Sequence, residues 1–197
     1  MSSDVIRFAV GTSSLGSVLV GVSDKGVCAI LLGRDPDGVA RGLRDRFPSA
    51  QLITEGEKLG QLMATVVDFV EAPALGLDLM LDLRGTAFQL QVWQALGEIP
   101  AGSTASYSDI AGRIGAPETA LEVAQACASN AIAVAIPCHR VVRKNGALSG
   151  YRWGVWRKRA LLQREAAAVA STRLLKNPQD AQKGPDARRR PTAAREA

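Results

Sequence analysis

The sequence predicts an α+β protein whose first half is a small sheet with helices and whose second half is mostly helical. Two observations support this class. Three short apolar runs with strand character open the chain, at residues 5–10, 17–22 and 27–32. After residue 85, apolar residues instead recur with helical spacing behind serine and threonine caps. With 197 residues, the chain is long enough for one large domain or two small ones.

The first half of the chain is expected to be a three-stranded meander followed by two helices. Residues 23–26 form the turn between the last two strands, with a glycine where a positive φ is favoured. Asp35 and Pro36 supply an N-cap and a first-turn proline for the first helix. A second helix is expected over residues 57–71. The alternating leucines of residues 77–83 indicate a last strand or an extended linker.

The second half is expected to begin with three helices. Thr86 and Ser106 each stand three residues before a side chain that can complete a capping box, and a third helix is expected over residues 117–129. The last two helices, joined by a turn that contains Gly115, have the outline of a helix-turn-helix. Helical hairpins are also common in proteins that never touch DNA, so both interpretations stay open. The third helix is rich in alanine and poor in basic side chains, which favours a narrow groove over base reading in the major groove.

A short apolar run at residues 131–136 leads into Pro137, Cys138 and His139, and this histidine is the only one in the protein. The run fits a buried strand, although periodicity alone does not exclude a buried helix, and Pro137 favours the strand because it biases the residue before it away from the helical region. Two interpretations of the Cys-His pair stay open. Cys138 is either a small buried hydrophobic residue or a nucleophile whose thiolate is favoured by the imidazole and by nearby positive charges.

The segment Pro137-Cys138-His139-Arg140-Val141-Val142 is followed by the motifs GALSGYRWG at residues 146–154 and RKRALLQRE at residues 157–165. Together these segments resemble the O6-alkylguanine-DNA alkyltransferases and are most similar to the carboxy-terminal repair half of the bacterial Ada proteins. The resemblance implies an RNase H-like scaffold domain over residues 1–84. It implies a DNA-binding and catalytic domain, with the helix-turn-helix, over residues 85–167.

The resemblance also implies direct reversal of O6-alkylguanine damage, in which Cys138 takes the alkyl group irreversibly and each molecule acts once. His139 then takes up the thiol proton through water, and Glu165 holds the imidazole. Asn130 fixes the turn at the active site. The expected DNA-binding residues are Tyr107, Leu121, Gln125 and Arg140. The expected residues of the alkyl pocket are Val141, Ser149, Tyr151, Arg152 and Trp153.

Leu121 departs from the family, whose members usually carry an arginine that fills the gap left by the flipped nucleotide. An aliphatic wedge can still hold a base step open, but it cannot hydrogen-bond the orphaned base. Glu122 adds a negative charge, and Gln125 replaces a glycine, so weaker DNA binding or a different lesion preference is expected. A protein that binds lesions without repairing them is the second interpretation. A cysteine hydrolase is the third, for which the sequence offers no oxyanion-hole motif.

The charge of the chain is unevenly distributed. Residues 1–85 hold 11 acidic and 8 basic side chains, whereas residues 86–165 hold 9 basic and 5 acidic ones. A basic half suggests contact with phosphate, although a solvated charged surface has a similar composition. Residues 168–197 are basic and lack aromatic side chains, which predicts a disordered basic tail. The expected partner is double-stranded DNA with an alkylated guanine, bound by a monomer.

The cysteine and histidine counts argue against metal chemistry. Three cysteines without a CxxC motif indicate reduced thiols, and with a single histidine neither a metal site nor a cofactor is expected. The longest apolar runs fall short of the roughly 18 residues of a membrane span, and the first residues lack the layout of a secretory signal. A cytoplasmic protein without a membrane partner is therefore expected.

Overall fold

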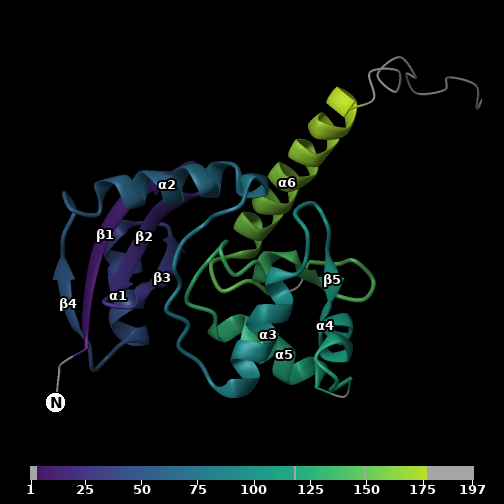
Figure 1. Ribbon diagram of the computed structural model, residues 1–197, viewed down its shortest axis with the longest axis horizontal. Coiled ribbons are helices and arrows are strands. Elements are labelled where there is room, and N and C mark those ends of the chain that lie inside the picture. Colours follow the sequence, from purple (N-terminus) through teal and green to yellow (C-terminus); the bar gives the residue numbers. More distant parts are fainter. Residues whose placement is uncertain (1–3, 118, 149, 177–197) are drawn as a thin grey trace, which may run out of the picture.

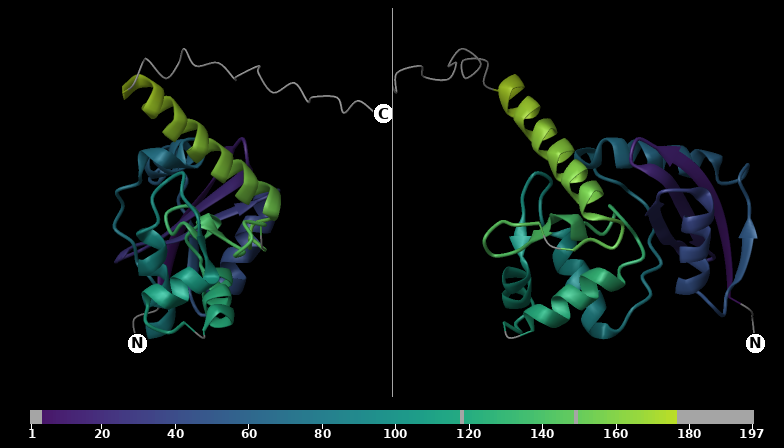
Figure 2. Two further views of the ribbon diagram at one scale, coloured as in Figure 1. Left: turned by 90° about the vertical axis from the view of Figure 1, so that its right-hand side faces the viewer. Right: turned by 180° about the vertical axis from the view of Figure 1, so that it is seen from behind.

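The computed structural model describes residues 4–117, 119–148 and 150–176, which form an α+β fold with two lobes (Figure 1). The first lobe holds a four-stranded sheet and two helices, and the second holds three helices and a short two-stranded sheet. A last helix, α6 (Val155–Lys176), contacts both lobes at its start and projects away from them at its end (Figure 2).

The sheet of the first lobe has the strand order β3-β2-β1-β4. The three predicted strands are confirmed as β1 (Val5–Ser13), β2 (Gly16–Ser23) and β3 (Gly26–Gly33), and they pair antiparallel. The predicted turn is also confirmed, with a φ of +136° at its glycine. The sequence does not predict β4 (Gln51–Thr54), which pairs parallel with β1. Its four residues are exposed or only partly buried, so they carry no clear apolar pattern.

Both predicted helices of the first lobe are confirmed, and both pack on the sheet. α1 (Pro36–Arg46) begins at its predicted cap, because the Asp35 carboxylate accepts a hydrogen bond from the amide of Gly38 at 2.7 Å. α2 (Gly60–Glu71) begins three residues later than predicted, after a turn.

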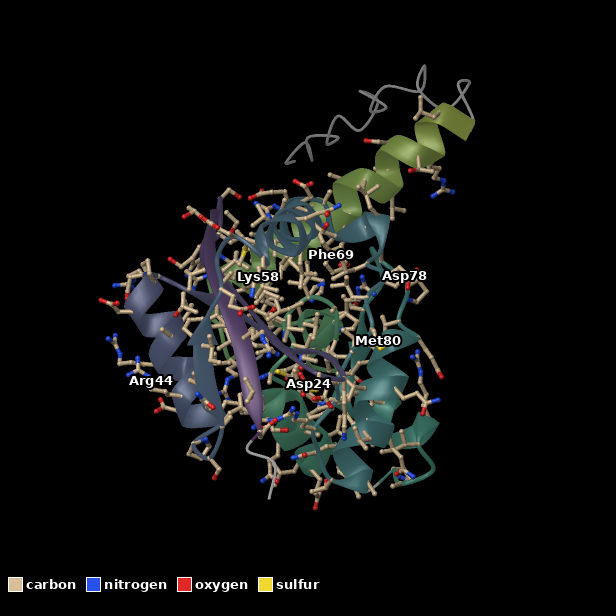
Figure 3. The ribbon with its side chains drawn as sticks, turned by 60° about the vertical axis from the view of Figure 1, so that its left-hand side comes forward. Asp24, Arg44, Lys58, Phe69, Asp78 and Met80 are labelled. Atoms are coloured by element: carbon tan, nitrogen blue, oxygen red, sulfur yellow. The ribbon has the colours of Figure 1, made fainter. Side chains whose placement is uncertain are left out.

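The linker between the lobes is only partly regular. It opens with a short 3-10 helix, η1 (Pro73–Leu75), and then runs beside β3, where the amide of Val27 donates to Met80 O at 2.9 Å. Of the two predicted alternatives, the extended linker is therefore the correct one. Asp78 and Met80 of this linker lie on the opposite side of the molecule from Arg44 on α1 (Figure 3).

The second lobe is built from the three predicted helices. These are α3 (Ala87–Gly97), α4 (Tyr107–Arg113) and α5 (Ala120–Ser129). The capping boxes predicted at Thr86 and Ser106 are both present. α5 begins three residues after its predicted start, and it packs against α3 and α4. The strands β5 (Ala105–Ser106) and β6 (Val141–Val142) pair parallel beside these helices.

The strand predicted at residues 131–136 is wrong. Only Ile132 pairs with the sheet, in a single bridge to β3, after which the chain turns. The cause is Asn130, whose side-chain amide takes up backbone groups of Ile132 and Ile136 that would otherwise join a ladder. An apolar run of this length is compatible with a buried turn as well as with a strand when a side chain supplies the hydrogen bonds.

The tail predicted over residues 168–197 is also corrected at its start. Helix α6 continues to Lys176, because the alanine-rich segment at residues 166–170 has high helix propensity. Residues 177–197 lie outside the described part of the chain. Among the described residues, no helix has the length and apolar character that crossing a bilayer demands.

Candidate active site

Asn130 organises the turn that carries Cys138. It follows the last residue of α5, and it is almost completely buried. Its Oδ1 accepts from the amide of Ile132 at 2.8 Å, while its Nδ2 donates to Ile132 O and Ile136 O at 3.2 and 3.1 Å. The same Nδ2 lies 3.3 Å from Cys138 Sγ. One amide side chain thus fixes the turn and also touches the sulfur.

Cys138 begins a short 3-10 helix, η2 (Cys138–Arg140), and its side chain is 5% exposed. Burial raises the pKa of the thiol to about 11, although the hydrogen bond from Asn130 and the positive charge of Lys158 oppose this effect. The sulfur therefore carries its proton at neutral pH. A reaction at this sulfur must remove that proton, and a base is needed to receive it.

His139 and Glu165 form a fully buried pair, with 2.7 Å between His139 Nε2 and Glu165 Oε1. Burial lowers the pKa of the imidazole, against the opposing effect of Glu165. The imidazole is therefore neutral near pH 7, and Nε2 is assigned the proton because it faces a carboxylate. Nδ1 is then an acceptor, and it has no hydrogen-bond partner among the described residues.

Glu165 is held in place by more than the histidine. Its Oε2 accepts from the amide of Gly102 at 3.1 Å, and its Oε1 accepts from Arg140 Nη2 at 2.9 Å. Burial by itself raises the pKa of this carboxyl, but the hydrogen bonds from His139 and Arg140 outweigh it and hold the pKa at about 2. Glu165 is consequently a fixed anion at any pH above mildly acidic values.

The structure places Arg140, which the sequence predicts to bind DNA, inside the protein, and its role at DNA stays a prediction. Its side chain is only 10% exposed, with Nη1 on Ile99 O at 2.6 Å and the rest of the guanidinium on Glu165. The guanidinium is thus already paired inside the protein. A buried carboxylate such as Glu165 needs a positively charged partner. The place of Arg140 in the sequence, directly after the Cys-His pair, does not show whether its side chain points inward or outward.

A cavity of about 460 Å³ opens beside Cys138. It is lined by Tyr107, Ala124, Cys127, Ala128, Cys138, Arg143, Gly150, Tyr151 and Arg152. Three residues predicted for the site, Tyr107, Tyr151 and Arg152, thus meet the sulfur at one cavity. Val141 and Trp153 are buried and are not part of this lining, and Ser149 lies outside the described residues.

The two predicted DNA-binding residues on α5 are exposed. Leu121 is 70% exposed, which is unusual for a large aliphatic side chain, and Gln125 is also on the surface. Ala124, on the same helix, lines the cavity. The surface of α5 that carries Leu121 therefore lies close to the mouth of the site.

Lys158 is the largest fully buried side chain of the described residues, and its place at the site is not predicted from the sequence. Its Nζ donates to Val141 O, and its positive charge lowers the pKa of both Cys127 and Cys138. The only available signal is the spacing to Glu165, which puts both residues on one face of α6 two turns apart.

The described residues hold no group of three histidine, cysteine or acidic side chains that could bind a metal ion. What the site offers is a protonated thiol, a neutral imidazole backed by a carboxylate, and a buried ammonium beside one cavity. This arrangement is suited to nucleophilic attack by sulfur on a small electrophilic carbon.

Comparison with known families supports this chemistry. Residues 87–167 match the family model described as "6-O-methylguanine DNA methyltransferase, DNA binding domain". The chain is 35% identical over 162 residues to the inducible methylated-DNA--protein-cysteine methyltransferase of Bacillus subtilis, which covers 82% of this chain and 86% of that protein.

A longer relative and a solved structure are also similar. The bifunctional transcriptional activator/DNA repair enzyme Ada of Escherichia coli is 48% identical over 161 residues. The match covers 82% of this chain and 46% of that protein, so the chain spans about half the length of this relative. The crystal structure of Mycobacterium tuberculosis OGT in complex with DNA superposes with a TM-score of 0.69 at 32% identity, covering 82% of this chain and 93% of that one.

Proposed function

The chain belongs to the methylated-DNA--protein-cysteine methyltransferase family, and on that premise we propose that it repairs O6-alkylguanine in double-stranded DNA by moving the alkyl group onto Cys138. The observation that carries the proposal is that Cys138, in the lining of the cavity, directly precedes the histidine of the buried His139–Glu165 pair. The Bacillus subtilis relative, whose name states this activity, matches 82% of this chain.

The proposed reaction is one displacement at carbon. The thiol proton moves through a water molecule to His139 Nδ1, and the sulfur forms a bond to the alkyl carbon while the bond from that carbon to guanine O6 breaks. Glu165 stabilises the imidazolium that forms. Guanine leaves intact after taking up a proton, for which the Tyr107 hydroxyl is the proposed donor, and the tyrosinate then regains a proton from the imidazolium through water. Because a thioether is not readily reversed, each molecule reacts once.

The cavity is proposed to hold the flipped base. The backbone carbonyls of Cys138 and Val141 accept from the purine amine, and Val141 O keeps a lone pair for this purpose beside its bond from Lys158. Tyr151 and the main-chain amide of Arg152 lie at the alkyl group and the leaving oxygen. Trp153 supports Tyr151 from behind, with the two rings 5.1 Å apart in an edge-on arrangement.

DNA binding is proposed to use α4 and α5 as a helix-turn-helix in the minor groove. Leu121 then enters the base stack as an aliphatic wedge, which its exposure permits, and Gln125 lies at the backbone. We propose that the N-terminal lobe, with its strand order β3-β2-β1-β4, is an RNase H-like scaffold. A monomeric state and a cytoplasmic location remain predictions of the sequence.

The deciding experiment is to incubate the protein with a duplex oligonucleotide that carries O6-methylguanine and then to measure the mass of the peptide that contains Cys138 by mass spectrometry. A stable gain of one methyl group on that peptide, at one per protein molecule, supports repair. Tight binding without an adduct would indicate a lesion-binding protein instead. Turnover of many oligonucleotides by one protein molecule would indicate a hydrolase.

A further inference from the structure

Helix α6 presents two stripes of side chains to two different partners. Lys158 and Glu165 lie two turns apart on the stripe that faces the reactive thiol. Arg157 and Arg164 each precede one of these residues, so they lie about 100° around the helix on a neighbouring stripe. Both arginines contact the N-terminal lobe through groups that are far from them in sequence.

Arg157 ties the start of α6 to the hairpin between β1 and β2 and to the last residue of β3. Its Nε donates to Leu15 O at 2.7 Å, and its Nη2 donates to Gly33 O at 2.6 Å. The third donor, Nη1, is 2.7 Å from Trp153 O in its own segment. A guanidinium can meet three carbonyls at once because its donors are arranged in a planar fork. Burial of this side chain costs free energy, which the three bonds offset.

The hairpin between β1 and β2 is shaped to receive this arginine. Gly16 has a φ of +99°, and a Cβ at this position would lie 2.5 Å from Gly33 O and 3.1 Å from Arg157 Nη2. A larger residue would therefore strain the backbone and crowd the guanidinium. The hairpin and the start of α6 fit together only with glycine at this turn.

Arg164, two helical turns after Arg157, makes a second attachment between α6 and the N-terminal lobe. Its Nη1 donates to Val70 O at 2.6 Å, and its Nη2 contacts Ser14 Oγ and lies 3.0 Å from Glu71 Oε2. Glu71 in turn accepts from the Ser14 amide at 2.6 Å. The end of α2, the hairpin and α6 are thus joined by one network.

We propose that Arg157 and Arg164 are positioning residues for alkyl transfer, which fasten α6 to the N-terminal lobe so that Lys158 and Glu165 stay at the reactive thiol. The proposal rests on the proposed function of Cys138. It assigns the N-terminal lobe a defined part in the reaction, although none of its side chains lines the cavity among the described residues. A helix held at two points seven residues apart cannot rotate or slide without breaking one of these attachments.

The test compares Arg157→Met and Glu71→Gln with Arg159→Met, which removes an exposed arginine from the same helix. Glu71→Gln alters the network from the other lobe, where it is partly exposed, and so provides a milder variant should Arg157→Met fail to fold. The measurements are the single-turnover rate of methyl transfer and its pH profile, at a temperature well below unfolding. The expected result is a rate lowered between about tenfold and a hundredfold by Arg157→Met, less by Glu71→Gln, and not by Arg159→Met.

The pH profile separates positioning from plain stability. His139 is faced by Glu165 and Lys158 from α6 and by Arg140 from η2, and burial is the main cause of its lowered pKa. If α6 loosens, water reaches the imidazole and its pKa rises. As the pH is lowered, the imidazole of the variant should then become protonated sooner, so the acid limb of the rate profile should shift to higher pH than in the parent protein. A lower melting temperature with unchanged rate and pH profile would overturn the inference. A parent protein that forms no adduct would instead overturn the proposed function.

Discussion

His139 Nε2 and Glu165 Oε1 lie 2.7 Å apart, and neither side chain has any exposure to solvent. Glu165→Gln should slow alkyl transfer by at least about tenfold, because the imidazole loses the anion that stabilises its protonated form. It should also lower the free energy of unfolding by about 3 kcal/mol, since Arg140 is left as a buried cation without its partner.

Single-turnover kinetics and urea unfolding measure the two effects of Glu165→Gln. Glu57→Gln is the matched control, since Glu57 is exposed in the other lobe. An unchanged transfer rate in the Glu165 variant would contradict the role of the carboxylate, whatever happens to stability.

Stability should fall in acid mainly through Glu165. Its pKa is about 2 in the folded chain against an ordinary 4.5, so the unfolded chain binds the proton first as the pH falls. The contribution, on the order of 3 kcal/mol, is fully present above about pH 4.5 and is lost as the pH falls toward 2. His139 acts in the same direction, because its lowered pKa makes the folded state less stable below its ordinary 6.5.

Urea unfolding midpoints between pH 7 and pH 3 test this dependence. The parent protein should lose stability steeply over this range, and Glu165→Gln should lose much less. Parallel curves for the two proteins would show that other groups control the acid limb.

Lys158→Met should raise the pKa of Cys138 further above its present value, because the positive charge that opposes burial is removed. The rate of methyl transfer at neutral pH, and the rate of thiol alkylation by iodoacetamide, should each fall about tenfold for each pH unit by which the pKa rises. The fold should survive, since replacing a buried charge by an apolar side chain of similar length is often neutral or stabilising.

The comparison for Lys158→Met is Lys25→Met, which removes an exposed charge at the turn between β2 and β3. If both variants react with iodoacetamide at the parent rate, the buried ammonium has no influence on the sulfur.

Leu121→Ala should separate DNA handling from chemistry. The exposed position predicts a change in unfolding free energy within about 0.5 kcal/mol. Transfer from duplex DNA should slow because the wedge is lost, while transfer from the free base O6-methylguanine stays at the parent rate. Leu121→Arg should increase the affinity for duplex DNA. If the new charge contacts one phosphate, the slope of the logarithm of the binding constant against the logarithm of the salt concentration should become steeper by about 0.9.

Leu75→Ala is the control for Leu121→Ala, since Leu75 is also a highly exposed leucine, at 83%, but lies in the linker. If Leu121→Ala slows transfer from duplex DNA and transfer from the free base equally, Leu121 does not act as a wedge in the base stack.

The sequence by itself determined the α+β class, the first three strands and the helices α1 to α5, and it singled out Cys138 as the proposed reactive cysteine. These depend on short-range physics: Asp35, Thr86 and Ser106 cap helices through groups three residues away, so their effect is visible in the local letters. The run at residues 131–136 shows where local letters fail, because apolar character reports burial and not backbone conformation.

Only the tertiary structure decided which charged residues turn inward. Arg140, which was expected on the DNA-binding surface, hydrogen-bonds instead to Glu165, 25 residues away in the sequence. Arg157 hydrogen-bonds to Leu15 at a separation of 142 residues. Lys158 is buried beside a sulfur that no spacing rule connects to it. A buried charge is stable only with partners that folding brings from distant segments, and the sequence does not contain their distances.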